Sequence, residues 1–321
     1  MTGAFTAAAI VGTGTMGTGF AQVFGQHAVR CQIADASAEL AVAARERVLA
    51  HARRYAEIGL LPEGADEIAA EQVVACDSIE AAVAGVDVVL EAVPEDPQIK
   101  NAVLARVESA CDPTAIVASN TSAIPISDLA EALRRPEQFL GAHWFNPPQW
   151  IPCVELIPTV HTDPHVVATL TGLLRQVGKQ PSLVRDSAGF VANRIQFAMF
   201  KEAVAVVADG VATAEEVDEI VRGSFGFRLP FFGPFAIGDM AGLDVYLGAY
   251  QALSQAHGDR FEAPELIREL VAAGRLGHKA GHGVLSAPDD PAAVAERRDR
   301  LYAALGELVN DVRRGGTRAM G

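Results

Sequence analysis

Cysteine is scarce in this sequence, and long apolar runs are absent from it. Only four of the 321 residues are cysteines, and no two stand at metal-finger spacing, so neither a disulfide framework nor a metal site is predicted. No apolar run reaches the ~18 residues that cross a bilayer. No basic segment precedes an apolar stretch near the N-terminus. We therefore expect a cytoplasmic protein with no membrane partner.

Basic residues are outnumbered as well. The chain carries 26 lysines and arginines against 40 aspartates and glutamates, which gives a formal net charge of −14. This balance argues against a protein whose main partner is nucleic acid or an anionic membrane surface. Half of the residues are hydrophobic, which is enough for substantial cores. The length predicts about two domains of roughly 100–200 residues each.

The predicted secondary structure changes along the chain. The first half alternates short apolar strands, at residues 7–12, 31–35, 86–93, 115–119 and 139–145, with helices such as 38–58 and 98–110. After about Asp186 helical patterns prevail, at 193–208, 242–257, 264–273 and beyond 288, and Thr213 with Glu216 matches a capping box. An α/β domain with a doubly wound sheet is predicted for residues 1–186, and a helical domain for 187–321.

A glycine-rich turn follows the first predicted strand. Gly12, Gly14 and Gly17 fit the pattern G-x-G-x-x-G, and Thr15 and Met16 stand where a helix should begin. Glycines there allow a tight turn and a close approach of the backbone to a pyrophosphate, whose charge meets the free N–H groups of the helix. A dinucleotide site is predicted, and a Walker-type loop is excluded because no Gly-Lys-Ser/Thr occurs.

The end of the second predicted strand indicates which dinucleotide binds. Asp35 stands 18 positions after Gly17, close to the ~20-residue offset at which an acid binds the ribose hydroxyls. Its carboxylate would repel a 2′-phosphate, and no arginine follows it until Arg45. The expected cofactor is therefore NAD rather than NADP.

Three more segments carry polar residues. They are SNTS (119–122), GAHWFNPP (141–148) followed by Glu155, and AGFVANR (188–194). Together with GTGTMG, these segments resemble the L-3-hydroxyacyl-CoA dehydrogenase family, over residues 7–284. The resemblance implies a Rossmann-type NAD-binding domain followed by an all-α C-terminal domain, and a homodimer formed through the helical domain. It also implies an enzyme of fatty acid metabolism that acts on a small hydroxyacyl substrate.

The resemblance also implies roles for individual residues. His143 matches the family's base, Glu155 its acidic partner twelve residues later, and Ser122 and Asn193 the residues that bind the substrate oxygen. A histidine suits removal of a hydroxyl proton, and a carboxylate on its other nitrogen fixes the tautomer and stabilises the imidazolium. On the cofactor side, the resemblance adds Glu95, Lys100, Asn146 and again Ser122.

Some of these residues also have a structural interpretation. Ser122 could cap a helix that begins near Pro125, and Lys100 could be an ordinary surface lysine. The two helix positions that contact CoA in the resembling enzymes fall on His51 and Ile58, so neither residue type is preserved. Arg53 and Arg54 lie close by; they could bind phosphate or simply face solvent.

A second departure lies in the segment GFRLPFFGP (226–234), which is about three residues longer than the usual family loop and introduces Arg228. This loop, together with NPPQWIPCVEL (146–156), resembles the branch that includes L-gulonate and L-carnitine dehydrogenases, which act on free hydroxycarboxylates. A guanidinium suits a free carboxylate because it can form two parallel hydrogen bonds with it. Alternatively, Arg228 ties the loop to an acidic neighbour such as Asp239.

The favoured hypothesis is an NAD-dependent dehydrogenase of L-3-hydroxyacyl-CoA thioesters. The first alternative is the same chemistry on a small free 3-hydroxycarboxylate. The related enzymes with a catalytic lysine are disfavoured because that position is Gly189 here. A non-catalytic NAD-binding protein with a structural or sensing role would be expected to lose the base or its partner, and both His143 and Glu155 are present.

Overall fold

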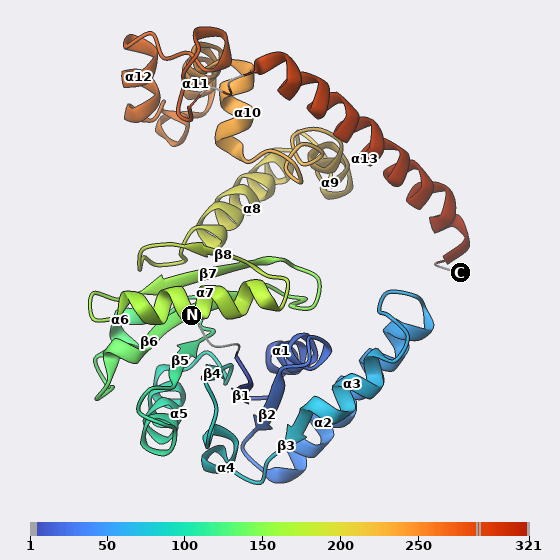
Figure 1. The fold of residues 1–321 in the computed structure, drawn as a ribbon. Helices are drawn as coiled ribbons and strands as arrows, with labels where there is room; N and C mark the ends of the chain where they lie inside the picture. The colour runs from blue at the N-terminus through green and yellow to red at the C-terminus, as the bar shows by residue number, and fades with distance from the viewer. Residues whose placement is uncertain (1–4, 287, 289, 320–321) are drawn as a thin grey trace. The chain divides into compact units, whose positions relative to one another are not determined.

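The computed structural model describes residues 5–286, 288 and 290–319. The chain forms two units, Met1–Met199 and Phe200–Gly321, and the division falls inside helix α8 (Ala192–Ala208). The first unit contains the sheet, and the second is built from helices (Figure 1).

Within the described residues, an eight-stranded sheet organises the first unit. Its strands are β1 (Ala7–Val11), β2 (Arg30–Ala34), β3 (Val73–Ala75), β4 (Val88–Glu91), β5 (Ile116–Ser119), β6 (Phe139–Trp144), β7 (Cys153–Pro158) and β8 (Gln180–Leu183). They lie in the order β3-β2-β1-β4-β5-β6-β7-β8; β1 to β6 are parallel, β7 is antiparallel to β6, and β8 is parallel to β7. The predicted doubly wound, Rossmann-type sheet is confirmed.

Strands β3, β7 and β8 lie outside the predicted set. Strand β3 has only three residues, and β8 is a largely exposed edge strand, so neither carries a long apolar run. Strand β7 has the sequence CVELIP, in which a buried carboxylate, Glu155, interrupts the apolar pattern. These strands form because they pair with their neighbours, which a local pattern does not reveal.

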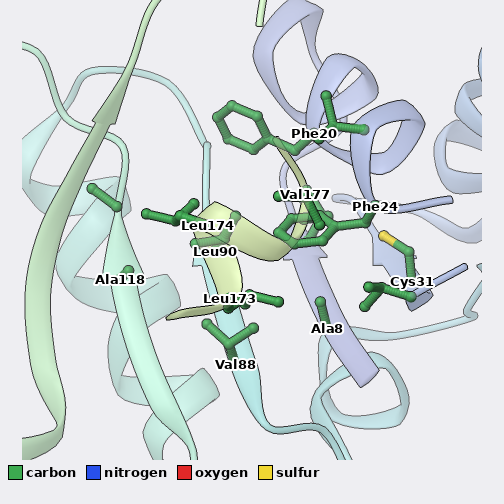
Figure 2. Close-up of a cluster of buried hydrophobic side chains, with 14 of the residues drawn as sticks. Ala8, Phe20, Phe24, Cys31, Val88, Leu90, Ala118, Leu173, Leu174 and Val177 are labelled. Atoms are coloured by element: carbon green, nitrogen blue, oxygen red, sulfur yellow. The ribbon is translucent and has the colours of Figure 1, made fainter. Parts of the chain in front are cut away.

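Helices cover both faces of the sheet. They are α1 (Thr15–Gln26), α2 (Ala38–Glu57), α3 (Ala65–Gln72), α4 (Ile79–Val83), α5 (Pro97–Ala110), α6 (Ile126–Ala130) and α7 (Pro164–Gln176), with a 3₁₀ turn at Pro136–Gln138. Because side chains alternate along a strand, Ala8 packs with Phe20 and Phe24 in a core shared with α2 and α7 (Figure 2). Its neighbours Ala7 and Ala9 belong to the opposite core, with α4, α5 and α6.

The second unit contains the rest of α8 and the helices α9 (Ala214–Gly223), α10 (Pro234–Ala241), α11 (Leu243–His257), α12 (Glu265–Ala272) and α13 (Pro291–Ala319), with 3₁₀ turns at Asp259–Phe261 and His278–Ala280. The predicted capping box is present: the Thr213 side chain accepts from the Glu216 N–H, and the Glu216 side chain accepts from the Thr213 N–H. In the described part of the chain, no helix combines the length and the apolar character needed to cross a bilayer.

Candidate active site

The candidate site residues of the first unit gather at one edge of the sheet. The strand order reverses between β1 and β4, and the crevice outside the carboxyl ends of such strands is where ligands bind in doubly wound sheets. The glycine loop follows β1, Asp35 follows β2, and Ser122 follows β5. His143 is the next-to-last residue of β6.

The glycine loop has the shape that a pyrophosphate requires. A Cβ on Gly17 would lie 1.9 Å from the carbonyl oxygen of Gly12, and a Cβ on Gly12 would lie 2.7 Å from the backbone of Ala92, so both positions need glycine. A Cβ on Gly14 would meet nothing within 4 Å, which leaves open space at this turn. Helix α1 starts at Thr15 without a side-chain cap, so its first N–H groups can bind an anion. These residues fit NAD.

Asp35 is held by the same loop. Its Oδ2 accepts from the N–H of Thr13 at 2.6 Å and from the Thr13 Oγ1 at 2.5 Å, and its Oδ1 accepts from the N–H of Ala36 at 2.7 Å. Burial alone would raise the pKa of Asp35, but these hydrogen bonds and the positive charge of Arg47 outweigh it, so the pKa lies below its ordinary value. The carboxylate is therefore charged at neutral pH, as binding to ribose hydroxyls requires.

His143 and Glu155 form a buried pair across two antiparallel strands. The β6–β7 register places them directly opposite each other, and the His143 Nδ1 lies 2.8 Å from the Glu155 Oε2. Each residue is 3% exposed. The rings of Phe145 and Phe190 lie with their centroids 4.6 and 5.5 Å from that of His143. This contact orients the imidazole, and its Nε2 has no hydrogen-bond partner among the described residues.

The second carboxylate oxygen of Glu155 binds the start of α8. Its Oε1 accepts from the N–H groups of Val191 and Ala192, both at 3.0 Å. Burial alone would raise the pKa of Glu155, but hydrogen bonds from His143 and from these two backbone groups outweigh it and lower the pKa. A carboxylate that stays ionised is able to stabilise a protonated imidazole beside it.

A side-chain hydrogen bond connects Asn193 to the loop that contains Ser122. The Asn193 Nδ2 donates to the carbonyl oxygen of Ser122 at 3.2 Å, and the Ser122 N–H donates to the Glu95 Oε1 at 2.9 Å. The Thr121 hydroxyl donates to the same Glu95 oxygen. Burial would raise the pKa of Glu95, but the Thr121 hydrogen bond and the nearby Lys100 charge outweigh it and lower the pKa.

Lys100 is buried in an ion-pair network, so the interpretation as an ordinary surface lysine is wrong. Its Nζ lies 2.8 Å from the Glu91 Oε1 and 3.5 Å from the Glu95 Oε2, and the lysine side chain is 1% exposed. The Ser119 hydroxyl donates to the other Glu91 oxygen at 2.5 Å. The network joins β4, β5 and α5 beneath the loop that contains Ser122.

Sequence reasoning missed Glu91 and Lys179. Glu91 is a single charged residue that ends the apolar strand VVLE, and that isolated charge is the signal that could have identified it. The Lys179 Nζ donates to the carbonyl oxygens of Pro148 and Ile151, at 2.5 and 2.9 Å, and lies 5.4 Å from the Trp144 ring centroid. Burial lowers the pKa of Lys179. This lysine fixes the loop that follows β6 and contains Asn146.

Two structural alternatives for site residues are wrong. The N-cap position of α6 is Pro125 and no side chain caps this helix, so Ser122 does not; the Thr121 hydroxyl accepts from the N–H of Ile124 in the preceding turn. Among the described residues, Arg228 forms no hydrogen bond or ion pair with Asp239, whose carboxylate instead accepts from the backbone N–H groups of Val284 and Leu285.

The arginines considered for the substrate differ in their surroundings. Arg53 pairs with Asp66 at 3.4 Å and Arg54 with Glu57 at 3.7 Å, and both arginines are exposed. Arg228 belongs to the second unit, is half-buried, and has no carboxylate within 4.0 Å among the described residues. It stands between aromatic residues: the rings of Phe227, Phe231 and Phe232 pack around Tyr302 of α13. No cluster of three metal-binding side chains occurs in the described ranges.

Comparisons with known proteins agree along most of the chain. The family model for the 3-hydroxyacyl-CoA dehydrogenase NAD binding domain matches residues 7–187, and that for the C-terminal domain of the same family matches residues 189–287. Helix α13 lies beyond both matches.

Individual relatives carry different substrate names. A 5-formyl-3-hydroxy-2-methylpyridine 4-carboxylate 5-dehydrogenase of Mesorhizobium japonicum is 33% identical over 303 residues, which cover 94% of this chain and 97% of the relative. A probable 3-hydroxybutyryl-CoA dehydrogenase of Deinococcus radiodurans is 34% identical over 275 residues, covering 85% and 97%. A solved 3-hydroxyacyl-CoA dehydrogenase of Archaeoglobus fulgidus superposes with a TM-score of 0.78 at 33% identity, covering 94% and 99%.

Proposed function

This chain belongs to the 3-hydroxyacyl-CoA dehydrogenase family, and we propose that it interconverts an L-3-hydroxyacyl-CoA and its 3-oxoacyl-CoA, with His143 as the base. The family makes it an NAD-dependent oxidoreductase. When bound, NAD supplies the acceptor for the hydride that leaves the carbinol carbon. The His143–Glu155 pair at 2.8 Å is the observation that supports this proposal most directly, because a merely structural NAD-binding protein has no need of it.

In the proposed mechanism, the residues of this chain move one proton and hold one oxygen. The free Nε2 of His143 accepts the hydroxyl proton as the carbonyl forms, and Glu155 stabilises the resulting imidazolium through the Nδ1–H. Ser122 and Asn193 hold the substrate oxygen and orient the carbinol carbon. Glu95 and Lys100 support the Ser122 loop on the cofactor side, and Asn146 is a further proposed cofactor contact.

A second candidate substrate is a small free 3-hydroxycarboxylate. Three observations favour it: Arg53 and Arg54 already have acidic partners, Arg228 has none among the described residues, and the Mesorhizobium relative is named for a free carboxylate. A thioester has no carboxylate near its reacting carbon. A free acid has one two bonds away, which a guanidinium could bind.

The experiment compares acetoacetyl-CoA with free gulonate and carnitine, using the natural chain and Arg228→Met. If the substrate is a thioester, the natural chain reduces acetoacetyl-CoA with NADH and the variant loses less than about twofold. If it is a free acid, the variant raises KM roughly tenfold or more, since a charge-assisted hydrogen bond contributes ~1.5–3 kcal/mol. If the natural chain neither oxidises NADH with acetoacetyl-CoA nor reduces NAD with gulonate or carnitine, both candidates are contradicted and the non-catalytic alternative is favoured.

We also propose that the chain is a cytoplasmic homodimer joined through its helical unit. Exposed apolar side chains of α8 and α9, including Phe200, Val204 and Val207, line a cavity of about 410 Å³. Contiguous exposed apolar patches on a protein surface often mark protein–protein interfaces. The proposed occupant is the same face of a second copy. In a two-fold dimer, the same surface patch of each subunit forms the interface.

A further inference from the structure

The glycine loop binds an arginine that the sequence pattern alone does not assign to the cofactor site. Arg47 lies on α2, and its Nη2 donates to the carbonyl oxygen of Thr13 at 3.0 Å. The same Thr13 donates its N–H and its hydroxyl to Asp35. One residue of the loop therefore contacts both Asp35, the proposed partner of the ribose, and the guanidinium of Arg47.

Arg47 forms no ion pair within the part of the chain that the structure describes, although its charge acts on Asp35. Its side chain is exposed, and among the described residues no carboxylate lies within 4.0 Å of it. Its one hydrogen bond there is the one to Thr13, so most of the five guanidinium N–H donors remain available. Arg45, two positions earlier, differs. Its guanidinium donates to the carbonyl oxygens of Val73 and Ala70, so it is engaged in hydrogen bonds within the fold.

We propose that Arg47 is a second determinant of cofactor specificity, which attracts a 2′-phosphate and thereby opposes the exclusion of NADP by Asp35. A guanidinium recognises a phosphate monoester through paired hydrogen bonds and charge. The 2′-phosphate would sit on the ribose that Asp35 faces, next to the guanidinium that Thr13 holds. The preference for NAD is then a balance between repulsion by Asp35 and attraction by Arg47, rather than the effect of Asp35 alone.

The inference rests on the NAD-dependent function proposed above, and its test uses binding rather than turnover. Fluorescence titration of the full chain with NADH and NADPH gives both dissociation constants for the natural protein, Arg47→Met, Asp35→Ser and the double variant. Arg54→Met is the matched control, because it removes an exposed arginine from the same helix at a distance from the loop.

The expected pattern is specific to NADPH. Arg47→Met raises the Kd for NADPH roughly tenfold and changes that for NADH less than about twofold, as the loss of a charge-assisted contact predicts. Asp35→Ser lowers the Kd for NADPH at least about tenfold, and adding Arg47→Met removes most of that gain. Arg54→Met changes neither constant.

Two outcomes would overturn the inference while leaving the proposed function intact. In the first, Arg47→Met weakens NADH and NADPH equally, which would mean that Arg47 only braces the loop through Thr13. In the second, Asp35→Ser gains NADPH affinity that Arg47→Met does not reduce. By contrast, failure of the natural chain to bind NADH at all would contradict the proposed function itself.

Discussion

At the scale of single residues, the proposed chemistry depends on one imidazole and one carboxylate. Glu155 binds His143 through one oxygen and the start of α8 through the other. Its position therefore follows from two strands and a helix, and it has little freedom to turn away. This rigidity is what a base needs if its free nitrogen is to meet the same hydroxyl in every turnover.

Removing the imidazole should abolish most of the activity without affecting cofactor binding. His143→Ala should lower kcat/KM by roughly 10²–10⁴, the usual contribution of a general base. The Kd for NADH should stay within about twofold, because the glycine loop and Asp35 are unchanged. Steady-state kinetics and fluorescence titration measure the two quantities. Near-normal turnover would exclude His143 as the base.

Replacing the carboxylate should affect both the rate and the pH dependence of stability. In Glu155→Gln, kcat for oxidation of the alcohol should fall, because an amide stabilises the imidazolium less than a carboxylate does. The pKa of Glu155 is lower in the folded protein than its ordinary value of 4.5, so its ionised form stabilises the fold at pH values above 4.5. That stabilisation is lost as the pH falls through the pKa of the folded protein. Urea titrations between pH 3 and 6 should therefore show a shallower loss of stability in Glu155→Gln than in the natural chain.

At the scale of elements, the glycines in the turn between β1 and α1 meet two different requirements: one is steric and belongs to the fold, and the other is space for a ligand. Gly17 is needed by the fold, since a Cβ there would collide with Gly12 at 1.9 Å. Gly14 has φ of −65° and open space beside it, so the fold itself would accept a side chain. The lack of a side chain at Gly14 is therefore explained by a ligand that approaches the backbone closely.

These two glycines offer a matched pair of variants. Gly14→Ala should keep the melting temperature within about 2 °C and raise the Kd for NADH at least about tenfold, because the new methyl group occupies the pyrophosphate space. Gly17→Ala should lower the melting temperature as well, because the backbone must shift. Calorimetry with titration separates the two effects. Unchanged NADH affinity in Gly14→Ala would argue against this loop as the pyrophosphate site.

At the scale of the whole molecule, the helical unit has large apolar side chains that its own packing leaves exposed. Phe200 is 63% exposed, and it lines the cavity of about 410 Å³ between α8 and α9. Burying such side chains against a second copy would contribute about 25 cal/mol per Å² of apolar surface. The proposed dimer accounts for this face of the second unit.

Light scattering tests the assembly directly. The natural chain should give twice the 33.8-kDa mass of one chain at micromolar concentration. Phe200→Asp should give the single mass, because a buried and unpaired charge opposes association. Leu60→Asp changes an exposed apolar residue of the first unit and should leave the dimer intact. A single-chain mass for the natural protein would contradict the proposal.

Local patterns determined much of this protein. The alternation of apolar strands and helices, the sequence GTGTMG and the placement of Asp35 predicted the doubly wound sheet and its NAD site, because each depends on neighbours close in sequence. The resemblance carried by SNTS, GAHWFNPP and AGFVANR predicted which polar residues belong together. These features are largely independent of how distant segments pair.

The tertiary structure decided what depends on distant contacts. Only the β6–β7 register places His143 opposite Glu155, and only the packing of α5 against β4 buries Lys100 beside Glu91. The contact of Arg47 with Thr13 spans 34 positions and leaves no local signature. A sequence pattern records the periodicity of one element, whereas these charges find their partners through the pairing of strands and the packing of helices onto the sheet.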